Sequence, residues 1–187
     1  MPVTMLDPKT ALIVIDLQNG IVALAGSDAV STVVANAARL AEAFRHRGLP
    51  VVLVNVVPSG APRRTEQTRS LPVLPSGWDE IVPELHKQPT DHRVTKHTWG
   101  AFSGTGLDTW LSEQGVTQVV MAGVSTSIGV DTTARQAFEK GFNVVFAIDA
   151  MTDMSADAHA HCMTRIFPRI GETGTTQQII DLLKGNA

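Results

Sequence analysis

The chain has 187 residues, of which 43% are hydrophobic and 18% are charged, and its formal net charge is −3. A chain of this length buries one sizeable core without metals or disulfides, so we predict a single domain over residues 1–187. The weak negative charge, with no basic run longer than Arg63-Arg64, argues against nucleic acid or an anionic membrane as a partner and favours a small-molecule substrate.

Apolar runs rich in β-branched residues alternate along the chain with segments of helical periodicity. In chain order, the pattern predicts a strand at residues 11–15, a helix at 29–47, strands at 51–57 and 93–96, a helix at 107–114, a strand at 119–122, a helix at 128–140, a strand at 144–148 and a helix at 155–167. Gly48, Gly115 and Gly141 follow three of these helices, where glycine supplies the left-handed conformation that ends a helix. This alternation is typical of an α/β fold in which helices cover both faces of a parallel sheet.

Residues 58–89 interrupt the alternation with six prolines and a basic, polar centre at residues 63–69. We expect a long surface excursion rather than a linker between domains, because too few residues flank it to form a second core. Its expected role is that of a lid over a site or of an oligomer contact.

The expected surroundings of the protein follow from its apolar segments. No apolar run approaches the roughly 20 residues that span a bilayer, and residues 1–5 show neither a basic stretch nor a signal cleavage site. We therefore expect a cytoplasmic protein without membrane association. Its high apolar content predicts that some apolar side chains stay on the surface of the folded chain. Because a second copy of the chain would bury them, we also expect a homo-oligomer, a dimer or a tetramer.

Cys162 is the only cysteine, which excludes an intrachain disulfide and a zinc site built from several thiolates. It lies in the helix expected at residues 155–167. We interpret it as a structural thiol rather than a reactive one.

Polar residues stand where the predicted strands end, and the carboxyl ends of parallel strands form the ligand-binding edge of such a sheet. Asp16 follows the first strand, where apolar neighbours raise a carboxyl pKa and suit the group to proton transfer; capping of a turn is the alternative. Lys96 ends the strand at residues 93–96, and it pairs with Asp16, holds an anion, or is a solvated surface charge.

The segments after these strands offer further candidates. Trp99 and Phe102 are either core residues or walls of a pocket, and His97 is either a proton shuttle or an exposed loop residue. The turn before the helix at residues 128–140 offers backbone N–H groups and hydroxyls that bind an oxyanion or a carboxylate, or else cap that helix. Its members are Val124, Ser125, Thr126 and Ser127.

Four ordered motifs together resemble the isochorismatase-like hydrolase superfamily over residues 10–183. They are Asp16-Leu17-Gln18, Lys96 with Gly100-Ala101-Phe102-Ser103-Gly104-Thr105, Gly123-Val124-Ser125-Thr126-Ser127-Ile128-Gly129-Val130 with Thr133-Ala134-Arg135-Gln136-Ala137, and Phe167-Pro168-Arg169-Ile170-Gly171. The resemblance implies a three-layer α/β/α fold with a Rossmann-like sheet of about six mostly parallel strands.

The superfamily's catalytic set of Asp, Lys and Cys matches this chain at Asp16 and Lys96, whereas Gly129 stands at the cysteine position. The resemblance therefore implies a hydrolase without the family's thiol nucleophile. We expect the substrate contacts to come from Gln18, Trp99, Phe102, Val124, Ser125, Thr126 and Ser127.

Isochorismatases proper are similar in keeping the Asp and the Lys with a glycine in place of the Cys. The resemblance implies vinyl-ether cleavage of isochorismate to pyruvate and a dihydro-dihydroxybenzoate, with Asp16 as proton donor, Lys96 steering the substrate and positioning Asp16, and Gly129 making room for the ring. Two alternatives stay open. One is a small-molecule-binding or regulatory protein that lost catalysis with the cysteine, and the other is an amidase with another nucleophile such as Ser127.

The zinc site of the family's nicotinamidases needs an Asp-x-His and a further His after the second strand, where this chain has Asn55-Val56-Val57-Pro58-Ser59-Gly60. We therefore expect no metal and no cofactor. The resemblance also implies a cis peptide bond between Val124 and Ser125, in the turn after the fourth strand.

Overall fold

The computed structural model describes residues 1–26, 28–59 and 73–185. One sheet forms its centre, with the strands β1 (Thr10–Ile15), β2 (Val51–Val56), β3 (His92–Lys96), β4 (Gln118–Val124), β5 (Asn143–Thr152) and β6 (Glu172–Gly174). Neighbouring strands are all parallel, and their order is β3-β2-β1-β4-β5-β6. The predicted parallel sheet of about six strands is confirmed.

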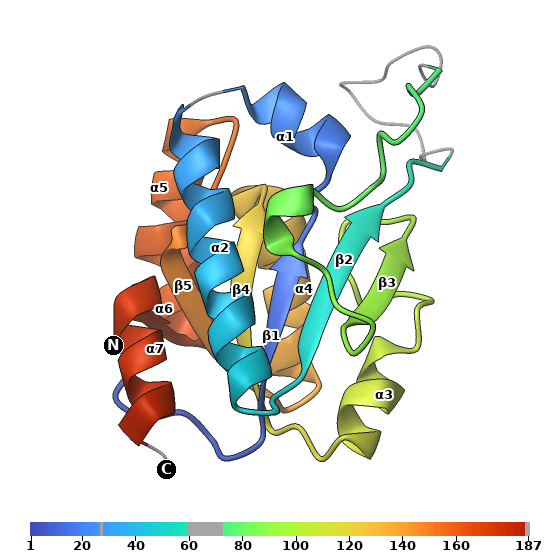
Figure 1. Cartoon of the computed structure of the whole chain (residues 1–187). Helices are drawn as coiled ribbons and strands as arrows, with labels where there is room; N and C mark the ends of the chain where they lie inside the picture. Colours follow the sequence, from blue (N-terminus) through green and yellow to red (C-terminus); the bar gives the residue numbers. More distant parts are fainter. Residues whose placement is uncertain (27, 60–72, 186–187) are drawn as a thin grey trace.

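Helices cover both faces of this sheet, which confirms the three-layer α/β/α arrangement (Figure 1). On one face, α2 (Asp28–His46) and α7 (Thr176–Gly185) pack over Leu12 and Val14 of β1. On the other face, α3 (Leu107–Glu113), α4 (Asp131–Glu139) and α6 (Phe167–Ile170) pack over Ile13 and Ile15. Because successive side chains of a strand point to opposite faces, a sheet covered on both sides requires the uninterrupted apolar run seen in β1.

The helix ends follow the sequence, since Gly48, Gly115 and Gly141 have φ values of 64°, 69° and 88° just beyond α2, α3 and α4. Across the part of the chain that the structure describes, no helix has the length and apolar character needed to cross a membrane.

Several elements differ from the prediction. A π-helical turn, Thr126–Val130, precedes α4, and another, Cys162–Ile166, follows α5 (Ala156–His161), so the helices expected at residues 128–140 and 155–167 are not continuous α-helices. β5 continues to Thr152 rather than ending at residue 148, because an irregularity in its register with β4 lets the pairing resume at Met151. The pattern did not indicate α7, α1 (Asn19–Ala25) or the three-residue β6, and the last two are too short to show a periodicity.

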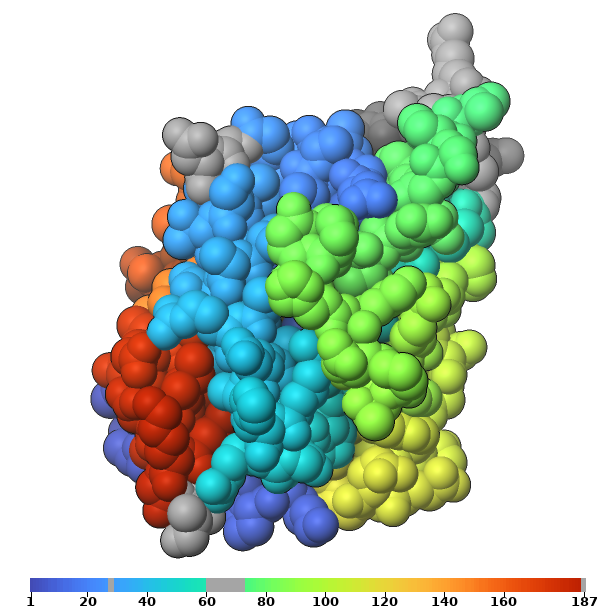
Figure 2. Space-filling view, viewed as in Figure 1, coloured from blue at the N-terminus to red at the C-terminus, as the bar shows by residue number. Residues whose placement is uncertain are grey.

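The excursion between β2 and β3 is only partly a surface segment. Residues 60–72, which include the basic centre, lie outside the described residues. Beyond them the chain runs back along the protein, and Ile81, Val82 and Leu85 are buried in the core beneath α2. Figure 2 shows this segment, in green, lying against the blue side chains of α1 and α2. The expected surface excursion is therefore wrong for Ile81, Val82 and Leu85, because their apolar side chains complete that core.

Candidate active site

The strand order changes direction between β1 and β4, since the chain proceeds from β1 to β2 and β3 on one side and from β4 to β5 and β6 on the other. Ligands of open α/β sheets bind beyond the carboxyl ends of the strands at such a switch point. Asp16 follows β1 directly and has a positive φ of 52°, a conformation that Asp tolerates better than most residues. Its N–H still donates to Val54 O at 2.9 Å, which holds it at the sheet edge.

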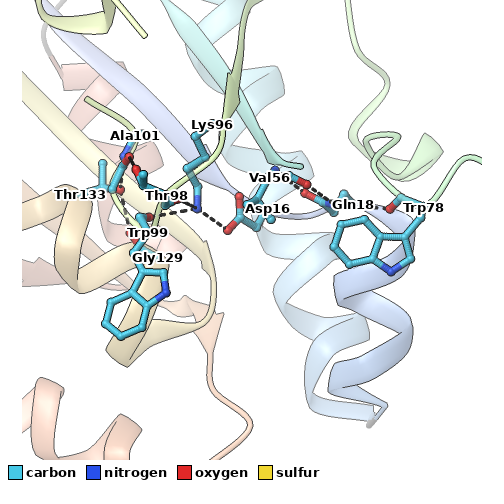
Figure 3. A network of polar contacts seen from close by, with 11 residues as sticks. Asp16, Gln18, Val56, Trp78, Lys96, Thr98, Trp99, Ala101, Gly129 and Thr133 are labelled. Atoms are coloured by element: carbon cyan, nitrogen blue, oxygen red, sulfur yellow. Dashed lines mark hydrogen bonds and ion pairs between the residues drawn. The ribbon is translucent and has the colours of Figure 1, made fainter. Parts of the chain in front are cut away.

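Lys96, the last residue of β3, forms a buried ion pair with Asp16. Its Nζ lies 2.8 Å from Asp16 Oδ2, and the two side chains are only 2% and 8% exposed. The same Nζ donates to Thr98 O at 3.3 Å and to Trp99 O at 3.0 Å (Figure 3). Since an ammonium group has three N–H donors, these three acceptors occupy all of them. Lys96 therefore holds Asp16 in place and has no donor left for a substrate anion.

The environment of Asp16 changes its protonation. Burial raises the pKa of its carboxyl group from 3.8 to about 6, although the charge of Lys96 and its hydrogen bond pull the pKa down. The second carboxyl oxygen, Oδ1, is buried and accepts no hydrogen bond from any residue that the structure describes. When Asp16 is protonated, the proton can therefore lie on Oδ1, while Oδ2 still accepts from Lys96. A carboxyl group with a pKa of about 6 can give up or accept a proton near neutral pH.

Gly129 lies beside this carboxyl group, in the π-helical turn after β4. A Cβ atom at Gly129 would lie 3.1 Å from Asp16 Oδ2 and 2.9 Å from Ile15 Cγ2. Position 129 therefore faces Asp16 and Lys96, and the glycine brings no reactive group to them.

Thr133 links the π-helical turn at Gly129 to the loop after β3 through two hydrogen bonds. Its Oγ1 donates to Gly129 O at 2.7 Å and accepts from Ala101 N at 3.1 Å. Gln136, one helical turn further on, accepts from Phe102 N at 3.2 Å through Oε1. Neither residue was among the predicted site residues; the signal that points to Thr133 is its place four residues after Gly129, from which a threonine hydroxyl reaches back to that carbonyl.

Two hydroxyls of the predicted turn, those of Thr126 and Ser127, bind residues just after β5 and in α5. Asp153 Oδ2 accepts from Ser127 N at 2.6 Å and from Ser127 Oγ at 2.8 Å, and Thr126 Oγ1 lies 2.9 Å from His159 Nδ1. The peptide bond between Val124 and Ser125 is cis, as expected from the resemblance. Sequence reasoning missed Asp153 because the predicted strand ended at residue 148, whereas β5 places Asp153 at the sheet edge.

Two of the residues predicted to contact substrate are buried in the structure. Gln18 is fully buried, and its amide binds the backbone of Val56, donating to O at 3.0 Å and accepting from N at 2.7 Å. The ring of Phe102 is buried beside Phe142, with ring centroids 6.1 Å apart. Both side chains therefore have partners within the protein. Trp99, by contrast, is 61% exposed.

The remaining predicted positions have ordinary partners. The Nδ1 atom of His97, an exposed residue, lies 3.0 Å from Val57 O. Asn55, which stands where the resemblance implies the first zinc ligand, accepts from Thr95 Oγ1 at 2.9 Å. Outside residues 27, 60–72 and 186–187, no group of three or more His, Cys, Asp or Glu residues is placed to hold a metal ion.

Comparison with known proteins agrees with this geometry. The sequence matches the isochorismatase domain over residues 10–178. It is 41% identical over 182 residues to YwoC, an isochorismatase family protein of Bacillus subtilis, covering 94% of this chain and 95% of that protein. It is 31% identical over 176 residues to the ureidoacrylate amidohydrolase RutB of Pseudomonas syringae, covering 78% of this chain and 72% of that one.

A solved structure gives the same result. An isochorismatase family protein from Burkholderia thailandensis superposes with a TM-score of 0.88 at 44% sequence identity, covering 96% of this chain and 98% of that one. The resemblance carried by the four sequence motifs is thereby confirmed: the chain belongs to the isochorismatase family and is a hydrolase.

Proposed function

We propose that the protein hydrolyses the vinyl ether of a small cyclic anion, converting isochorismate to pyruvate and a dihydro-dihydroxybenzoate. The observation that supports this reaction is the Asp16 carboxyl group, with its pKa raised to about 6 and its Oδ1 atom without a partner. Position 129, beside this carboxyl group, carries a glycine and thus no nucleophile. An acid at this place suits a reaction that begins with protonation and needs no covalent intermediate.

The reaction would proceed in three steps. Asp16 donates its proton to the methylene carbon of the enolpyruvyl group, which leaves an oxocarbenium ion at the ether carbon. Water adds to that carbon and returns one proton to the Asp16 carboxylate. The resulting hemiketal collapses: the bond from its carbon to the ring oxygen breaks, the proton of the hemiketal hydroxyl group passes to the ring oxygen, which leaves as a hydroxyl group of the ring product, and pyruvate forms.

Lys96 supports this cycle through Asp16 rather than through the substrate. Its ammonium group, 2.8 Å from Asp16 Oδ2, stabilises the carboxylate that forms when the proton leaves. Without that charge the buried acid would hold its proton too strongly to donate it. For substrate contact we propose Trp99 and the backbone of Val124 and Ser125, because the side chains of Thr126 and Ser127 are already hydrogen-bonded.

The pH dependence of turnover tests the proposed role of Asp16. Purified protein is incubated with isochorismate and the pyruvate released is measured from about pH 5 to about pH 8. Since the acid acts in its protonated form, kcat/KM is expected to be constant well below the Asp16 pKa of about 6 and to fall about tenfold per pH unit above it. Absence of pyruvate release, or a rate that rises through the same range, contradicts the proposal.

Amide hydrolysis is the second candidate, because RutB, a named amidohydrolase, is 31% identical to this chain. In that reaction an ionised Asp16 would accept a proton, so activity would increase as the pH rises through about 6. The Ser127 hydroxyl donates to Asp153 Oδ2 at 2.8 Å, so a serine nucleophile at this position would be paired with Asp153 and not with Asp16. Hydrolysis of ureidoacrylate with that pH profile, abolished by Ser127→Ala, would establish the amidase instead. A ligand that binds and is never consumed would indicate a binding protein.

A thiol introduced at position 129 tests the geometry of the site. In Gly129→Cys combined with Cys162→Ala, the new Cβ atom would lie 3.1 Å from Asp16 Oδ2 and 2.9 Å from Ile15 Cγ2, so both side chains must shift slightly to admit it. With the Lys96 ammonium beside it and Asp16 able to take its proton, this thiol is expected to react with iodoacetamide at least about tenfold faster than Cys162 of the wild type.

Cys162 of the wild type is the reference thiol for that experiment. It is buried, and burial together with Asp131 and Asp153 raises its pKa to about 11, so it forms little thiolate at neutral pH. Equal alkylation rates for the two thiols would contradict the placement of position 129 next to Asp16 and Lys96.

A further inference from the structure

Thr133 is a fully buried residue of α4 whose hydroxyl group bridges two segments of the candidate site. Its Oγ1 donates to Gly129 O at 2.7 Å in the π-helical turn and accepts from Ala101 N at 3.1 Å in the loop after β3. Figure 3 shows Thr133 between these two partners, on the side of Lys96 away from Gln18. A single oxygen atom therefore joins the turn to the loop.

Both of these segments lie beside the Asp16–Lys96 pair. In the turn, a Cβ atom at Gly129 would lie 3.1 Å from Asp16 Oδ2. In the loop, Thr98 O and Trp99 O accept from Lys96 Nζ at 3.3 Å and 3.0 Å. Because an ammonium group has three N–H donors, the position of the loop decides where two of the three acceptors of Lys96 lie.

The loop has a second connection to α4, which is nearer to solvent. Gln136 Oε1 accepts from Phe102 N at 3.2 Å, and Gln136 Nε2 donates to the exposed Ser103 Oγ at 2.8 Å. The bond between Thr133 and Ala101, by contrast, joins two fully buried residues. Without the Thr133 hydroxyl, Ala101 N would be a buried donor without an acceptor, which is costly enough to displace the loop.

We propose that Thr133 is a positioning residue of the active site: its hydroxyl group holds the loop after β3 against the turn at Gly129 and so keeps Lys96 bound to Asp16. It acts through two backbone groups, Gly129 O and Ala101 N. Its importance for catalysis rests on the proposed function. Its effect on Asp16 does not, because Lys96 lowers the pKa of that carboxyl group whatever the substrate is.

The test measures the titration of Asp16 without substrate, by ¹³C NMR of protein labelled at the aspartate carboxyl carbons. The signal of Asp16 is identified by its absence in Asp16→Asn. Thr133→Val keeps the shape of the side chain and loses the hydroxyl group, so Lys96 should bind Asp16 less closely. The titration midpoint of Asp16 is then expected to rise by at least about 0.5 pH unit. Thr133→Ser keeps the hydroxyl group and should titrate within about 0.2 pH unit of the wild type.

Kinetics of isochorismate cleavage give a second measurement. A Lys96 that binds Asp16 less closely stabilises the carboxylate less when the proton leaves. In Thr133→Val, kcat is therefore expected to fall at least about fivefold while KM stays within about threefold of the wild type. Thr133→Ser should restore kcat.

Thr10→Val is the matched control. Thr10 is also fully buried, but it begins β1 at the end opposite Asp16, and its Oγ1 has no hydrogen-bond partner among the described residues. Its substitution should leave the Asp16 midpoint and kcat unchanged. Thr133→Ala places no methyl group against Ala101 N, should shift the midpoint in the same direction as Thr133→Val, and takes its place if valine prevents folding.

A midpoint in the Val and Ala variants of Thr133 that equals the midpoint of Thr10→Val would overturn the positioning role. This holds even if both variants unfold at lower urea concentration, because a residue that only supports the fold changes stability and leaves the Asp16 midpoint in place. A raised midpoint with the kcat of the wild type would overturn the role of Thr133 in catalysis.

The two proposals fail separately. If isochorismate is not cleaved and Thr133→Val raises the Asp16 midpoint, the positioning role stands and the proposed reaction is wrong. If isochorismate is cleaved and Thr133→Val matches Thr10→Val in both midpoint and kcat, the reaction stands and the positioning role is wrong.

Discussion

Asp16→Asn is expected to reduce kcat for isochorismate cleavage by a factor of about 10² to 10⁴. The amide has nearly the shape of the carboxyl group, and its oxygen still accepts from Lys96, but its N–H groups are too weakly acidic to protonate carbon. Since the substrate would keep its contacts with the loops, KM should change little. Steady-state pyruvate release, compared at the optimum pH of the wild type, gives both constants.

Asp91→Asn is the matched control for this change. Asp91 is also buried and ion-paired, with its Oδ2 2.7 Å from Arg45 Nη2, but it precedes β3 at the opposite end of that strand from Lys96. Its variant should lose stability while keeping kcat within about threefold. A variant of Asp16 that keeps more than about a tenth of the wild-type kcat would show that another group supplies the proton.

Lys96→Met is expected to destabilise the folded protein by about 3–5 kcal/mol at pH values where Asp16 is ionised. Methionine fills most of the space of the lysine stem, but it leaves the Asp16 carboxylate buried without its 2.8 Å partner. It also leaves Thr98 O and Trp99 O without their shared donor. Urea unfolding at about pH 8 measures the loss.

The loss should depend on pH in a direction that follows from the pKa of Asp16. Because the folded-state pKa of about 6 exceeds the ordinary 3.8, the stability due to protonated Asp16 is complete below 3.8 and is lost as the pH rises through 6. Lys96 lowers that pKa, so its removal raises the pKa further and extends the decline to higher pH. The stability difference between Lys96→Met and the wild type should therefore be smaller near pH 5, where mainly the hydrogen bonds to Thr98 O and Trp99 O are lost, than near pH 8.

Lys140→Met provides the surface comparison. Lys140 pairs with Asp108 at 2.6 Å, but the two side chains are 39% and 38% exposed, so its loss should cost less than about 1 kcal/mol at either pH. If Lys96→Met costs no more than Lys140→Met, or the same amount at both pH values, then Lys96 does not stabilise a buried Asp16 carboxylate.

The strand pattern predicted the layers and the edge of the sheet at which the candidate site lies. The apolar run that ends at Ile15 requires burial on both faces, and the polar residue after it must lie at the carboxyl end of the strand. Lys96 was placed at the same edge by the same argument. The motifs also identified Gly129 as the position opposite these two residues, and the structure places it beside Asp16.

The roles of the neighbouring side chains could not be predicted in this way. Gln18, Phe102 and Ser127 are polar or aromatic residues in motifs near the site, yet their partners are Val56, Phe142 and Asp153. Val56 ends β2, Phe142 precedes β5 and Asp153 follows β5. Neither the composition of the chain nor the spacing of its motifs indicates which site residues contact these partners. The exposed indole of Trp99 and the buried ring of Phe102, three residues apart, show how local this choice is.

The sequence by itself determined the parallel α/β architecture, the placement of Asp16 and Lys96 at one edge, and the absence of a thiol there. The first two depend on side-chain type and periodicity, which are local, whereas the third rests on the family resemblance that places Gly129 at the cysteine position. Only the tertiary structure showed that the three N–H donors of Lys96 are bound to Asp16 Oδ2, Thr98 O and Trp99 O. It also showed that Asp16 Oδ1 has no hydrogen-bond partner among the described residues. Such assignments depend on which groups meet after the strands align, because a buried hydrogen bond requires both its distance and its direction.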